Sequence, residues 1–90
     1  MDRTIITVIG KDSVGIIAKV CSYLANNNIN IMDITQTTMQ GYFNMMMLVD
    51  PSESLKSHDE LAHELASLGR EIGVDIRAQK EEIFNMMHRI

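Results

Sequence analysis

A polar loop with two glycines is the segment of this chain most able to do chemistry. It reads Gly-Lys-Asp-Ser-Val-Gly from residue 10 to residue 15, and it joins a β-branched stretch to one with helical periodicity. A loop that opens onto a helix offers unpaired backbone N–H groups and the positive end of the helix dipole to a small anion. The loop therefore predicts a ligand site more than a catalytic one, with candidate residues Gly10, Lys11, Asp12, Ser13, Val14 and Gly15.

Enzymes that use a comparable loop need residues that this loop lacks. A phosphate-binding P-loop requires Lys and then Ser or Thr after its last glycine, where this chain has Ile16 and Ile17. An acylphosphatase would use an arginine in the first loop to hold phosphate, and Lys11 is a poor substitute for a bidentate guanidinium. No serine or cysteine has an assignable histidine partner for nucleophilic catalysis. We therefore expect no catalytic residue, no metal and no cofactor.

Composition restricts the partners. The 90 residues suffice for one domain, and a net charge of −4 with only two Tyr and two Phe argues against a nucleic-acid surface. No apolar run approaches the roughly 18 residues needed to cross a bilayer, and residues 1–4 lead into a strand-like segment instead of a signal peptide. A cytoplasmic protein without membrane contact is expected. Cys21, the single cysteine, cannot form an intramolecular disulfide and is expected to be a small buried side chain.

The first half of the chain predicts a strand, a helix and a hairpin. A strand is expected over residues 3–9, then a helix with Ser13 as its N-cap that ends in the asparagines at 26–28. Strands over 29–39 and 42–49 follow, joined by a tight turn at Gln40 and Gly41. Both faces of the returning strand are largely apolar, so we expect both to be covered, with its three methionines as core residues and not a soft-metal site.

The second half predicts a helix, a strand and a short terminal helix. Residues 57–60 fit a capping box, a leucine stripe continues to Ile72, and Gly73 stands where a C-terminal cap belongs. Alternation over 74–79 predicts a fourth, half-buried strand. Residues 80–90 predict an amphipathic helix, whose apolar side carries Ile83, Met86, Met87 and Ile90.

This order of elements predicts an α+β, ferredoxin-like βαββαβ fold. Two interleaved right-handed crossovers give a four-stranded antiparallel sheet with two helices on one face, and the second and fourth strands lie at its edges. Residues 1–79 form this domain, and the short C-terminal helix at 80–90 follows it. The fold is used too widely to decide function.

The loop at 10–16, the Asn-Ile-Asn-Ile segment at 28–31 and the strand that begins Gly41-Tyr42-Phe43 together resemble the ACT domain, an amino-acid-sensing regulatory module. The resemblance covers residues 3–79 and is closest to small proteins that consist of one such domain. It is also similar to the ACT domains of the glycine cleavage system's transcriptional repressor and of formyltetrahydrofolate deformylase.

The resemblance implies an amino acid bound between the first loop and the start of the second strand, across a dimer interface. Asp12 would accept hydrogen bonds from the ligand ammonium, and the N–H groups of Val14 and Gly15 would face its carboxylate. Asn30, followed by Ile31, would bond either group with its amide.

Two functions remain open. The first is a regulatory amino-acid-binding module that acts as a homodimer in the control of amino-acid metabolism, with the exposed edge of the second strand paired to its symmetry mate. The alternative is a structural or protein-interaction ACT domain without a metabolite ligand, in which the terminal helix at 80–90 contacts a protein partner.

Overall fold

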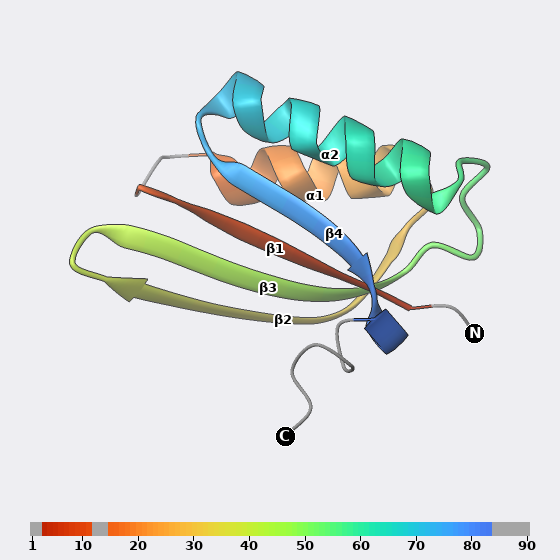
Figure 1. The fold of residues 1–90 in the computed structure, drawn as a ribbon, viewed down its shortest axis with the longest axis horizontal. Coiled ribbons are helices and arrows are strands. Elements are labelled where there is room, and N and C mark those ends of the chain that lie inside the picture. The colour runs from red at the N-terminus through yellow and green to blue at the C-terminus, as the bar shows by residue number, and fades with distance from the viewer. Residues whose placement is uncertain (1–2, 12–14, 84–90) are drawn as a thin grey trace.

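The chain folds into a four-stranded sheet with helices on one side (Figure 1). The computed structural model describes residues 3–11 and 15–83. The predicted order of strands and helices is confirmed. Most of the strands begin or end one or two residues away from the predicted positions. The elements are β1 Thr4–Lys11, α1 Ile16–Asn26, β2 Asn30–Met39, β3 Tyr42–Asp50, α2 His58–Ile72 and β4 Asp75–Lys80.

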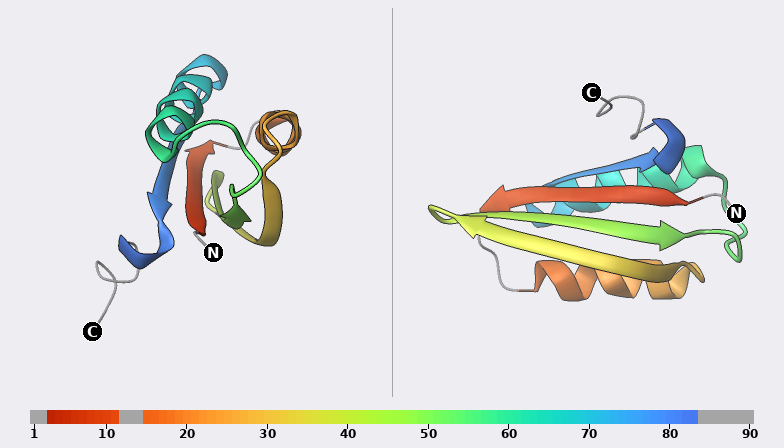
Figure 2. Two further views of the ribbon diagram at one scale, coloured as in Figure 1. Left: turned by 90° about the vertical axis from the view of Figure 1, so that its right-hand side faces the viewer. Right: turned by 90° about the horizontal axis from the view of Figure 1, so that it is seen from below.

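The sheet has the strand order β2-β3-β1-β4, and every neighbouring pair is antiparallel. The predicted edge positions of β2 and β4 are therefore confirmed. Figure 2 shows α1 over the β2 side of the sheet and α2 over the β4 side, with the opposite face of the strands free of long helices. Since β1 and β2 are each antiparallel to β3, they run parallel to each other, which decides where the candidate site residues lie.

The core lies between the helices and one face of the sheet. Alternation sends Phe43, Met45, Met47 and Val49 of β3 inward, and all four are buried. The prediction that Met45 and Met47 are core residues is confirmed, since neither side chain is exposed. The expectation that both faces of β3 are covered is wrong: Met46 on the other face is 40% exposed. Alternating apolar residues show that a face is compatible with burial, but not that an element covers it.

Helix α2 is closed at both ends by its own sequence. The Ser57 hydroxyl accepts from the Glu60 N–H, and the Glu60 carboxylate accepts from the Ser57 N–H, which confirms the capping box. The helix ends at Gly73, whose φ of 83° is the left-handed conformation that glycine adopts without strain. Both predicted caps of this helix are therefore confirmed.

Helix α1 begins later than predicted. Its N-cap is Gly15, with φ 89°, and its first helical residue is Ile16, so Ser13 is not the N-cap. The left-handed turn at Gly15 starts the helix two residues beyond the serine. Cys21 on this helix packs against the core but is only partly buried.

A polar cluster links the C-terminal half of α1 to α2. The Tyr23 hydroxyl donates to Glu64 Oε1 at 2.7 Å, and Lys56 Nζ lies 2.6 Å from the same oxygen. Burial, followed by the Glu64 carboxylate, raises the pKa of Tyr23, while hydrogen bonds from Lys56 and Tyr23 lower the pKa of Glu64. At neutral pH Tyr23 is therefore a neutral donor and Glu64 a charged acceptor, which is the combination that this link between the helices requires.

Candidate functional site

The N-terminus of α1 lacks the side-chain cap that α2 has. No side chain of the described residues bonds its first N–H groups, and its first turn contains no acidic residue. Among the described residues, the first hydrogen bond of the helix runs from the Lys19 N–H to the Gly15 carbonyl, and the N–H groups of Ile16, Ile17 and Ala18 precede it. This end of the helix is therefore suited to a ligand that accepts hydrogen bonds.

A hollow of about 520 Å³ lies at this helix end, between α1 and the inner face of the β2–β3 hairpin. Gly15, Ile16, Ile17 and Ala18 form the helix side of the hollow, and the sheet side is formed by Gln36, Thr38 and Phe43. The hollow combines apolar surface, an amide, a hydroxyl and backbone N–H groups that no side chain of the described residues bonds. It matches a small ligand that has an anionic group and an uncharged remainder.

The structure describes three of the six loop residues that were predicted to form the site. Gly10 and Lys11 are the last two residues of β1, and the Lys11 side chain is exposed. Gly15 lines the hollow. The predicted site residues Asp12, Ser13 and Val14 lie outside the described residues, so their roles stay predictions.

Asn30 and Ile31 lie at the other end of the sheet from the loop. Asn30 opens β2 and pairs with Asp50, whereas the end of β1 at Lys11 pairs with Tyr42, at the start of β3. With about 3.3 Å per strand residue, the eight residue steps from position 42 to position 50 separate the two places by roughly 26 Å. One chain therefore does not bring Asn30 and the first loop together.

Gln36 and Thr38 are the site residues that the sequence interpretation missed. Both belong to the predicted second strand, and the register pairs them with Met45 and Phe43, whose side chains are buried on the helix side. Pairing across the predicted hairpin turn would have given the same face from the sequence alone. The family resemblance pointed to Asn30 at the start of the strand, whereas the two residues that line the hollow belong to its C-terminal half.

Gly10 has a packing role that requires no ligand. A Cβ at this position would lie 2.5 Å from Val74 Cγ1 and 3.1 Å from Val74 Cβ. The end of β1 therefore approaches the residue before β4 too closely for any side chain. Gly15 differs, because a Cβ there meets nothing within 4 Å and its positive φ is the constraint.

We expect Gly10→Ala to destabilise the fold by about 1 to 3 kcal/mol, the usual range for overpacking. Val74→Ala in the same chain removes Cγ1 and is expected to recover about 1 kcal/mol or more of that loss as a favourable coupling energy. Urea unfolding of the two single variants and the double variant measures this. Additive effects would show that the contact between Gly10 and Val74 is not what demands a glycine.

Two kinds of feature are absent from the described part of the chain: a cluster of metal-binding side chains and a long apolar helix. Within residues 3–11 and 15–83, no group of three His, Cys, Asp or Glu side chains is placed to hold a metal ion. None of the helices there is long and apolar enough to span a bilayer.

The family of the chain follows from comparison with known proteins. The model of the ACT domain matches residues 2–79. The chain belongs to the ACT domain family. A UPF0237 protein of Bifidobacterium longum is 54% identical over 90 residues, which cover 100% of both chains. The ACT domain protein from Streptococcus pneumoniae has a solved structure with a TM-score of 0.82 and 38% identity, over 92% of this chain and 93% of that one.

Two larger ACT-containing proteins share the fold, as the resemblance predicted. A formyltetrahydrofolate deformylase from Pseudomonas syringae matches with a TM-score of 0.81 and 23% identity, over 89% of this chain and 28% of that one. A protein described as a glycine cleavage system transcriptional repressor matches with a TM-score of 0.74 and 22% identity, over 88% of this chain and 45% of that one. At these identities the likeness concerns the fold alone. The ACT domain prediction is confirmed.

Proposed function

We propose that this ACT domain is a regulatory module, not an enzyme, and that it binds an α-amino acid in the hollow at the N-terminus of α1 as a cytoplasmic homodimer. The ligand carboxylate accepts from the N–H groups at the start of α1, and Asp12 accepts from the ligand ammonium. Gln36 and Thr38 bond the polar parts of the ligand that remain, and Asn30 of the partner subunit completes the site.

The observation that carries this proposal is the position of Asn30 at the far end of β2. If two copies pair through β2 in antiparallel orientation about a two-fold axis near Thr35, residue 30 comes level with residue 40 of the other copy. Residues 40 and 41 form the turn beside Lys11 and the first loop. The same pairing that hides the edge of β2 thus carries Asn30 to the loop and hollow of the other chain.

The flank formed by α1 and β2 has the composition of an interface. Ile17 on α1 is 39% exposed and Ile34 on β2 is 40% exposed, both beside an edge strand. A bulge interrupts β2 at Met32, and Asp33 Oδ1 accepts from the Ile34 N–H at 2.9 Å. Bulges and charges of this kind limit pairing at an edge, so they direct it to the regular residues after Asp33. The two-fold axis near Thr35 is compatible with that restriction.

Calorimetric titration with each of the twenty amino acids, combined with sedimentation, tests the proposal. We expect heat from one or a few amino acids, and a dimer that the same ligand stabilises by mass action. Ile34→Lys is expected to weaken the dimer and the binding together, because it places a charge in the paired flank. Ile9→Lys is the control, since Ile9 is comparably exposed on the open face of the sheet and belongs to β1, which β3 separates from the paired edge of β2.

Three results would contradict parts of the proposal in distinguishable ways. A ligand bound by a persistent monomer would place the whole site in one chain. A dimer that gives no heat with any amino acid would favour an interaction domain without a metabolite. A monomer that gives no heat would overturn both the ligand and the assembly.

A further inference from the structure

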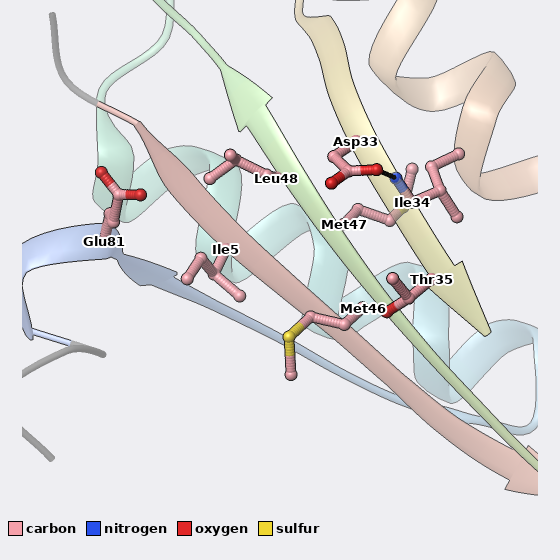
Figure 3. Close-up of a pocket in the computed structure, with 8 residues that line it drawn as sticks. All are labelled: Ile5, Asp33, Ile34, Thr35, Met46, Met47, Leu48 and Glu81. Carbon is pink, nitrogen blue, oxygen red and sulfur yellow. Dashed lines mark hydrogen bonds between the residues drawn. The ribbon is translucent and has the colours of Figure 1, made fainter. Parts of the chain in front are cut away.

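The open face of the sheet carries an apolar groove of about 150 Å³. Figure 3 shows Ile5, Met46 and Leu48 along the groove, with Asp33 on the β2 side and Glu81 beyond the end of β4. The two long helices lie on the opposite face, so neither covers this groove (Figure 2). Because the Glu81 carboxylate already pairs with Arg3, Asp33 at the β2 end is the acidic group that the groove presents to an occupant, which indicates an apolar stripe with a cation at that end.

The groove follows one row of side chains across the whole sheet. The register places Ile5 beside Gln79 of β4 and beside Leu48 of β3, and Leu48 beside Asp33 of β2. Neighbouring strands are about 4.8 Å apart, so the row is roughly 14 Å long from β4 to β2.

The chain itself is fixed at the β4 end of this row. The Glu81 N–H donates to the Arg3 carbonyl at 2.9 Å, and Arg3 Nη2 lies 2.7 Å from Glu81 Oε1. A helical turn begins at Glu81 and the described part of the chain ends at Ile83, which is 47% exposed. Seven further residues, 84–90, must therefore start beside the groove.

We propose that residues 84–90 continue this turn as a helix along the row, so that the chain's own C-terminal segment fills the groove. Ten helical residues from Glu81 to Ile90 span about 15 Å, which matches the width of the sheet. The apolar stripe then faces Ile5, Met46 and Leu48. Arg89, near the end of the segment, reaches the β2 side, where Asp33 offers the opposite charge.

The attachment at Glu81 favours the chain's own segment over that of a second copy. A tethered segment needs no second molecule and is present beside the groove at a high effective concentration. The proposal does not require a bound amino acid, because the groove lies on the face opposite to α1 and its hollow, although Asp33, Ile34 and Thr35 border both the groove and the proposed dimer edge.

Amide hydrogen exchange on the full chain tests this inference. We expect the amides of residues 84–90 to exchange about tenfold or more slowly than in an unstructured peptide. Leu48→Asp in the groove and Met87→Asp in the segment are both expected to abolish this protection. Ile9→Asp is the matched control, because it places the same charge on the same face of the sheet, about 13 Å along β1 from Ile5 in the groove. It is expected to leave the slow exchange of residues 84–90 intact.

Amide exchange within the domain distinguishes a loss of docking from misfolding of the variant. The amides of β1 must still exchange slowly in each variant, which shows that the domain is folded. If Leu48→Asp does not fold, Met87→Asp still tests the proposal, because residue 87 lies outside the domain. Unprotected amides at 84–90 in the unmodified protein would overturn the proposal, as would protection that neither variant reduces. Protection that disappears on dilution would assign the groove to a second copy and overturn it equally.

Discussion

A mixture of Asn30→Ala and Asp12→Ala chains is expected to recover the amino-acid binding that each variant lacks alone. In the proposed dimer, Asp12 of one chain and Asn30 of its partner serve the same site. A mixed dimer then has one site with both residues intact and one with neither. Random exchange makes half of the dimers mixed, so about a quarter of all sites recover, and calorimetric stoichiometry measures this fraction.

The control is a mixture of Asp12→Ala with Asp12→Leu, which removes the same acceptor from both chains and is expected to recover nothing. If the mixture of Asn30→Ala and Asp12→Ala stays inactive while both chains remain dimeric, the two residues do not share a site across the interface. This result would leave the hollow at α1 as a site of one chain and would remove Asn30 from it.

Gly69→Ala is expected to cost about 2 to 3 kcal/mol of stability, at the upper end for overpacking. Gly69 is buried in the last turns of α2, and a Cβ there would lie 2.6 Å from the Val74 carbonyl oxygen. That oxygen belongs to the main chain, and the Val74 N–H in turn donates to the Gly69 carbonyl at 2.8 Å. The clash can therefore be relieved only by moving the start of β4 away from the helix.

Urea unfolding measures this loss, with Ser67→Ala as the control. Ser67 is exposed on the same helix, and its replacement is expected to change stability by no more than about 0.5 kcal/mol. Val74→Ala is expected to give no relief to Gly69→Ala, in contrast to its effect on Gly10→Ala, because it leaves the main-chain oxygen in place. Equal relief of both variants would show that the Val74 side chain is the obstacle in each.

Local patterns were enough to predict the order of elements. The β-branched run of β1, the alternation of buried residues along β3, the capping box at Ser57 and the left-handed stop at Gly73 each depend on neighbours a few residues away. Strand order then followed from the handedness of the two crossovers. The resemblance to the ACT domain rested on the same order together with the loop.

Relations between distant segments were not predictable from such patterns. The close approach of Gly10 and Gly69 to Val74 depends on how β1 and α2 meet β4 in space. The exposure of Met46 depends on which face the helices leave open. Asn30 is a different case: β1 and β2 are parallel in this fold, so topology alone already sets the start of β2 at the opposite end from the loop.

The central position of β1 also affects how the chain folds as it is made. One side of β1 can pair with β3 once Asp50 has been synthesised, but the other side waits for β4, which begins at Asp75. At about 5 to 20 residues per second, the intervening 25 residues take roughly 1 to 5 s. For that time a β-branched strand has an open edge, so the nascent chain is most prone to aggregate just before its last strand appears.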